Sequence, residues 1–145
     1  MRQPLVIVGR LGLAVVFLWA GVAKLRDPWM VFAMQMDAMH IFPEASITFL
    51  ARTMPWVEVI LGFLLVAGIK MRYVAPVATF MLAVFFTVVT ILYFRGFQGD
   101  CGCFGPGEQL GPKTIARDGA LVILAIWVTW QVFRPPTGRR LLQYK

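Results

Sequence analysis

The sequence predicts an all-α membrane protein: a four-transmembrane-helix bundle with a short interfacial helix after the first span and a Gly-rich cysteine loop between the third and fourth spans. The chain of 145 residues is 59% hydrophobic and only 14% charged, whereas soluble domains carry about 25% charged residues. Four apolar segments also approach the roughly 20 residues that cross about 30 Å of hydrocarbon. We expect a single transmembrane domain over residues 1–145.

The four predicted spans cover about residues 5–23, 55–69, 74–94 and 115–133. The second span could begin earlier, near Ile47, because Pro43 and Ser46 mark another helix start. The first span follows Arg2 and resembles a signal peptide. Three further spans favour a retained helix instead.

The connections between the spans differ in kind. After the first span, Asp27 can cap a short helix with Pro28 at its first position. The apolar residues that follow indicate that this helix lies along the membrane interface or folds over one end of the bundle. The second connection is a tight link from Lys70 to Arg72. The third has glycine at positions 96, 99, 102, 105, 107 and 111 and proline at 106 and 112, which excludes a helix.

Basic residues lie on both sides of the predicted membrane in nearly equal numbers. The tight Lys70–Arg72 link and the basic tail lie on one side of the membrane, and their charge indicates that this side is the cytoplasm. We therefore expect both termini to be cytoplasmic and the cysteine loop to be extracytoplasmic. The net charge is +7, and the basic residues that produce it flank the apolar segments and form no patch with interleaved aromatic residues. Anionic lipid is therefore the expected counter-charge, and nucleic acid is not an expected partner.

Cys101 and Cys103 are the only cysteines of the chain, separated by Gly102. A thiolate attacks a disulfide most readily in exposed, electropositive surroundings, which the basic residues Arg95, Lys113 and Arg117 can supply. A disulfide across a single residue would be strained and therefore labile. It would close almost no loop, so a purely structural bridge is the weakest interpretation.

Three functions remain open for this cysteine pair. The favoured one is thiol–disulfide exchange, in which one cysteine attacks and the other resolves. The second is capture and transport of a soft metal such as Hg(II) or Cu(I); the spans contain no cysteine to receive the ion, and we predict no resident metal site. The third is a non-catalytic maturation subunit in which the cysteines are incidental.

Charged residues near the outer ends of the spans form a second candidate group. Glu58 lies about one turn inside the second span, and a carboxylate within hydrocarbon indicates a functional site. Lys24, Arg117 and Asp118 lie at comparable depth and are expected to converge with it below the cysteine loop. Glu58 could relay the proton of a thiol, or it could form a buried pair with Lys24 or Arg117 that fixes helix register.

A quinone is the candidate cofactor, because the chain has no second cysteine pair to carry electrons onward. A quinone needs a slot lined by aromatic side chains. Trp56 and Phe104, with Phe85 and Phe86, are the residues that we expect to supply it.

Three stretches of the chain resemble MauE-like (methylamine utilisation) membrane proteins of the DoxX-like superfamily. They are Gly21–Pro28, Pro55–Glu58 and Gly99–Gly105. The resemblance implies a multi-pass protein of the bacterial inner membrane that works with a periplasmic thioredoxin-fold partner in disulfide maturation. Relatives often have Arg-Asn where this chain has Arg117-Asp118. The resemblance leaves open whether the chain forms a homo-oligomer.

Overall fold

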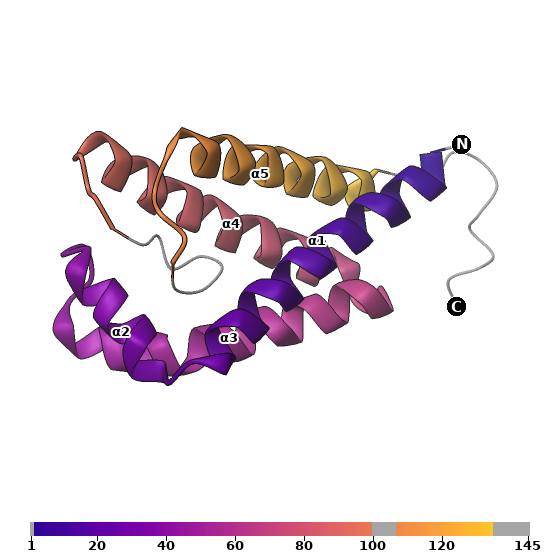
Figure 1. The fold of residues 1–145 in the computed structure, drawn as a ribbon. Coiled ribbons are helices and arrows are strands. Elements are labelled where there is room, and N and C mark those ends of the chain that lie inside the picture. The colour runs from indigo at the N-terminus through magenta and orange to yellow at the C-terminus, as the bar shows by residue number, and fades with distance from the viewer. Residues whose placement is uncertain (1, 100–106, 135–145) are drawn as a thin grey trace.

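The computed structural model describes residues 2–99 and 107–134, with side chains from residue 4 onward. Its helices are α1 (Arg2–Arg26), α2 (Trp29–Ala38), α3 (Glu44–Ala67), α4 (Met71–Phe94) and α5 (Pro112–Phe133), shown in Figure 1. Four of them, α1, α3, α4 and α5, are long and apolar enough to cross a membrane. The predicted four-span helical bundle is confirmed. Cys101, Cys103 and Phe104 lie outside the described residues, so the predictions about them stay predictions.

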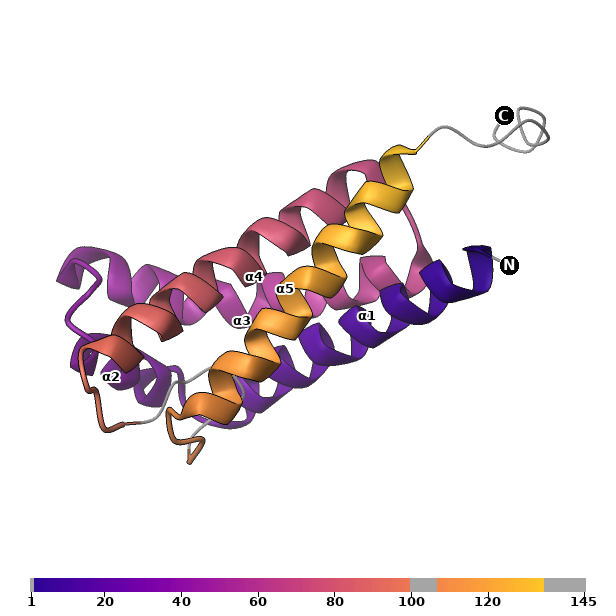
Figure 2. The same ribbon diagram turned by 90° about the horizontal axis from the view of Figure 1, so that it is seen from above.

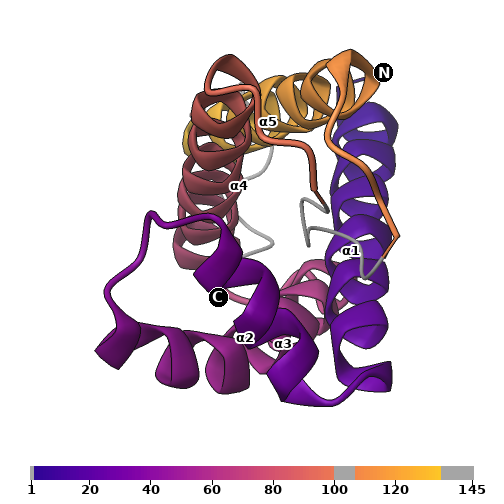
Figure 3. The same cartoon turned by 60° about the vertical axis from the view of Figure 1, so that its left-hand side comes forward.

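The four long helices form a ring in the order α1, α3, α4, α5, and each contacts its two neighbours (Figure 3). The pair α1–α3 and the pair α4–α5 lie close together where α1 begins and α5 ends, and they separate towards the end that carries α2 (Figures 1 and 2). We call this second end the mouth of the bundle. The loop between α4 and α5 starts and finishes at the mouth.

A continuous apolar core holds the ring together. Helices cannot gain hydrophobic energy by leaving lipid for one another, so close side-chain packing is what stabilises the bundle. The buried residues of this core come from all four long helices: Leu13, Ala14, Phe17, Leu61, Leu65, Val74, Ala78, Met81, Ala125 and Val128.

Two glycines let α1 and α3 approach closely. A Cβ atom on Gly21 would lie 2.6 Å from Val59 Cγ2 and 2.9 Å from the carbonyl oxygen of Pro55, and one on Gly62 would lie 2.6 Å from Leu18 Cγ. Small residues at such a crossing allow the helix backbones to pack directly against each other. The close approach at Gly21 brings the last turn of α1 against the middle of α3.

The start of α3 differs from the predicted second span. The helix begins at Glu44 and continues through Pro55, so the predicted helix start at Pro43 and the predicted span belong to one helix. Its first turns bury Ile47 and Ala51 against α2, and this burial outweighs the hydrogen bond that a proline removes.

The start of α2 is also one residue later than predicted. Pro28, not Asp27, is the N-cap of α2, and no side chain caps the helix. Phe32 and Met36 of α2 pack on α3, so contacts with α3, not a capping side chain, hold this short helix across the mouth.

Candidate functional site

A buried ion pair joins α1 to α3 near the mouth of the bundle. Lys24 Nζ lies 2.6 Å from Glu58 Oε1 and donates a hydrogen bond to it, and the two side chains are only 1% and 3% exposed. The Lys24 ammonium also lies 5.3 Å from the ring centres of Phe32 and of Phe85. Among the described residues, two aromatic rings and one carboxylate thus contact this cation, and such contacts compensate a charge at membrane depth.

The sequence explains how this pair is positioned. Lys24 follows Gly21 by three residues and therefore lies on the same face of α1. Glu58 immediately precedes Val59, the residue that a Cβ atom on Gly21 would meet on α3. The glycine crossing between the two helices therefore sets the register that brings the two charges together.

A second ionic group lies at the start of α5. Arg117 donates from Nε and Nη2 to Asp118 Oδ1 at 2.9 and 2.8 Å, and its Nη1 contacts Glu108 Oε1. Asp118 is buried, whereas the side chains of Arg117 and Glu108 are 36% and 26% exposed. One guanidinium is therefore shared by a buried carboxylate and a partly exposed one.

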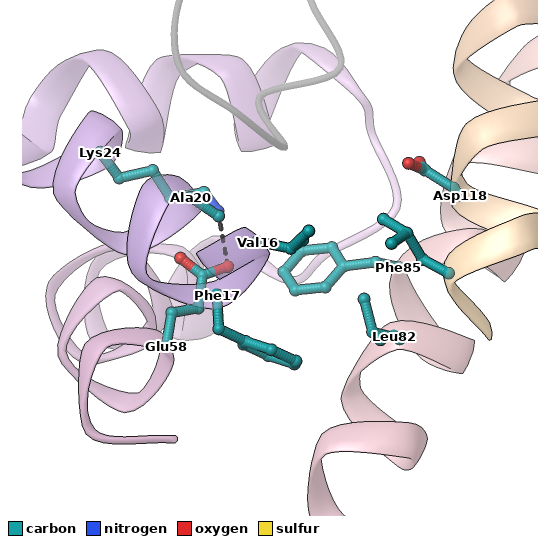
Figure 4. Close-up of a pocket in the computed structure, with 9 residues that line it drawn as sticks. Val16, Phe17, Ala20, Lys24, Glu58, Leu82, Phe85 and Asp118 are labelled. Carbon is teal, nitrogen blue, oxygen red and sulfur yellow. Dashed lines mark hydrogen bonds and ion pairs between the residues drawn. The ribbon is translucent and has the colours of Figure 1, made fainter. Parts of the chain in front are cut away.

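A cavity of about 30 Å³ lies between the two ionic groups. Lys24, Glu58 and Asp118 line it together with apolar residues of α1, α4 and α5, and Figure 4 shows the carboxyl groups of Glu58 and Asp118 on opposite sides of the Phe85 ring. Glu58 Oε2 and Asp118 Oδ2 are buried and accept no hydrogen bond from the described residues. The cavity has room for about one or two water molecules.

A larger groove of about 420 Å³ lies on the other side of Val16 and Leu121. It opens between α1 and α5, where Val15 and Trp19 supply apolar walls and the Arg117–Glu108 pair lies at one edge. Val16 and Leu121 line both spaces, so these two side chains separate the internal cavity from the groove.

The ends of the cysteine loop are fixed beside this site. The amide of Leu110 donates to the carbonyl oxygen of Gly99 at 3.2 Å, which joins the two described ends of the loop. Leu110 also packs on the buried Val89 of α4. Through its contact with Arg117, Glu108 then connects the second end of the loop to the ionic group at the cavity.

The predicted polar residues do come together, in two groups. The structure pairs Lys24 with Glu58, and Arg117 with Asp118, around one cavity. Trp56 does not join them: its side chain is 59% exposed on the outer surface of α3, and it is not among the residues that line this cavity.

Two residues of the site were missed by sequence reasoning. Glu108 looked like one of several acidic residues of the outer loops, and its pairing with Arg117 nine residues later has no sequence signature. Phe32 looked like an interfacial residue, and its contact with Lys24 depends on how α2 folds back over the mouth.

Four membrane-length helices around a buried ionic site define a multi-pass membrane protein with a charged cluster near one end of its bundle. A model of the family "Methylamine utilisation protein MauE" matches residues 2–131. Because this match covers most of the chain, the protein belongs to the MauE family, and the predicted resemblance to MauE-like proteins is confirmed. No curated protein and no solved structure matches the chain significantly.

Proposed function

We propose that this MauE-family protein is a membrane thiol–disulfide oxidoreductase that exchanges electrons through Cys101 and Cys103 with a periplasmic thioredoxin-fold protein. One observation carries the proposal most directly. The segment that contains the two cysteines is bounded by Gly99 and Leu110, which are hydrogen-bonded to each other, and Glu108 ties its second end to the buried ionic site. The described ends of this segment therefore lie at the same end of the bundle as Glu58 and Asp118, the only carboxylates that the described helices bury.

The exchange balances in bonds, electrons and protons without a further electron carrier. A thiolate on one protein attacks a disulfide of the other, so one S–S bond forms between the proteins and one breaks, releasing a partner thiolate. The second cysteine then attacks the mixed disulfide. Two electrons pass between the proteins, and the protein that starts as the dithiol loses two protons while the other gains two.

In this proposal Glu58 accepts or returns a proton of the reacting thiol. A general base must be close to the proton that it takes, directly or through a water molecule. Glu58 lines the cavity, and its Oε2 accepts no hydrogen bond from the described residues, which leaves that oxygen available for a proton. Lys24 holds the other oxygen and keeps the carboxylate oriented.

A quinone fits the described residues less well. Phe85 lines the cavity, but Trp56 points away on the outer surface of α3, so the two do not face one slot. No step of the proposed exchange therefore passes through a quinone. We further propose that the protein lies in a bacterial inner membrane with both termini cytoplasmic, because exchange with a periplasmic partner requires the cysteine loop on the outer side.

Trapping of the mixed disulfide tests this function. Cys101→Ser and Cys103→Ser are incubated in membranes with a disulfide-bonded thioredoxin-fold protein, so that the remaining thiolate attacks the partner's disulfide and one partner thiolate is released. A thiol-alkylating reagent then blocks the released thiolate and preserves the complex. We expect at least one single variant to accumulate a covalent complex that dithiothreitol releases, and the double Ser variant to form none. A complete absence of complexes from both single variants would refute the exchange mechanism. Tight Hg(II) binding lost in both variants, with metal-dependent uptake into vesicles, would support a transporter instead.

A further inference from the structure

The end of the bundle opposite the mouth is basic. This narrow end consists of the start of α1, the turn that joins α3 to α4, and the end of α5 (Figure 2). Its charged side chains, within the described part of the chain, are all cations: Arg10, Lys70, Arg72 and Arg134. The described carboxylates, at positions 27, 37, 44, 58, 108 and 118, belong to the mouth half of the molecule. The cations of the narrow end are therefore not paired with any described carboxylate.

Arg10 is the cation that lies within a span. It follows Pro4, the first residue of the apolar part of α1, by about 9 Å along the helix axis. Its side chain lies against the α3–α4 turn, since a Cβ atom on Gly68 would meet Arg10 Nη1. Arg10 is half-buried, and its Nε is buried without a hydrogen-bond partner among the described residues. A cation at this depth with an unpaired buried N–H is costly, and an anion bound to its Nη groups would offset that cost.

The α3–α4 turn brings further donors to the same place. Gly68 precedes Lys70 by two residues and Met71, the first residue of α4, by three. Three residues span at most about 11 Å, so the Lys70 backbone and the start of α4 both lie close to the Arg10 guanidinium. Lys70 is exposed, and no side chain caps α4. The first amides of a helix have no partner within it and point at the positive end of its dipole, which favours an anion there.

We propose that the narrow end binds the phosphate headgroup of one anionic phospholipid, held by the Nη groups of Arg10, the ammonium of Lys70 and the first amides of α4. A guanidinium binds phosphate through two parallel hydrogen bonds, and basic pockets between membrane helices are typical sites for anionic headgroups.

The apolar neighbours of these donors favour a lipid over free phosphate. Leu11 follows Arg10 directly and Ile69 follows Gly68 directly, and both side chains are exposed. They give the acyl chains of the lipid an apolar surface beside the headgroup. This inference uses no residue of the proposed thiol exchange, so it goes beyond that function and does not depend on it.

Native mass spectrometry of the full chain tests the inference, because it counts the lipid molecules that stay bound when the protein leaves detergent. Phosphatidylglycerol is compared with phosphatidylcholine that carries the same acyl chains. We expect the unmodified protein to retain one phosphatidylglycerol in preference to phosphatidylcholine. Arg10→Gln should weaken this binding about tenfold, the loss typical of one charge-assisted contact. Arg26→Gln is the matched control, because it removes the same charge from an exposed residue in the last turn of α1, and it should leave the binding unchanged.

Each other outcome would overturn the proposal. Equal losses in Arg10→Gln and Arg26→Gln would show a general attraction between a basic protein and an anionic lipid, without a site. Equal retention of the two lipids would show that the headgroup charge is not recognised. Displacement of the lipid by inorganic phosphate at a similar concentration would identify a site for soluble phosphate instead. If Arg10→Gln does not fold, the exposed Lys70→Gln decides, since an unchanged preference for phosphatidylglycerol in that variant contradicts a site at the α3–α4 turn.

Discussion

Replacement of Lys24 by Met is expected to destabilise the bundle by about 3–5 kcal/mol at neutral pH, the usual cost of removing one partner from a buried ion pair. The structure supports the full cost, because the Lys24 and Glu58 side chains are 1% and 3% exposed, so Glu58 would be left as a buried carboxylate without its ammonium partner. The substitution also removes the ammonium from between the Phe32 and Phe85 rings. Each such contact is worth about 0.5–2 kcal/mol.

Equilibrium unfolding in mixed micelles with increasing SDS measures this loss. The penalty should shrink as the pH is lowered, because protonation of Glu58 removes the uncompensated charge. The matched control is the double variant Lys24→Met with Glu58→Leu, in which neither charge remains. A buried pair replaced by apolar residues is often neutral or more stable, so the double variant should recover most of the loss. Additive effects of the two single substitutions would refute the buried pair.

The remaining predictions concern the glycines that set the helix packing. Gly62→Ala should cost about 1–3 kcal/mol in the same unfolding assay, because the new Cβ would lie 2.6 Å from Leu18 Cγ. Gly12→Ala is its control, since nothing lies within 4 Å of a Cβ at that position. Equal losses of stability in both variants would contradict the close crossing of α1 and α3. Gly68→Ala should be destabilising chiefly because its φ is +70°, and secondarily because a Cβ there would meet Arg10 Nη1, the end of a flexible side chain that can move. Shortening the side chain with Arg10→Ala should relieve only the second of these, so a Gly68→Ala cost that Arg10→Ala leaves unchanged would show that backbone strain alone is responsible.

The existence of the four spans could be predicted because it depends on local composition. About 20 consecutive apolar residues identify a membrane helix wherever the rest of the chain lies. The boundary of α3 could not be predicted in the same way. Pro43, Ser46 and Pro55 suggest interruptions, and only the packing of the residues between them on α2 makes the helix continuous from Glu44.

The sequence by itself determined that Lys24, Glu58, Arg117 and Asp118 are charges near one end of a membrane bundle. It left open whether Glu58 pairs with Lys24 or with Arg117. Only the tertiary structure decided this, because the choice depends on how closely two helices far apart in sequence approach, and that approach is set by the absence of a side chain at Gly21. The same reason explains why the shared cavity had no sequence signature. Residues from four helices line it, and Glu58 and Asp118 border one space only when those helices are assembled.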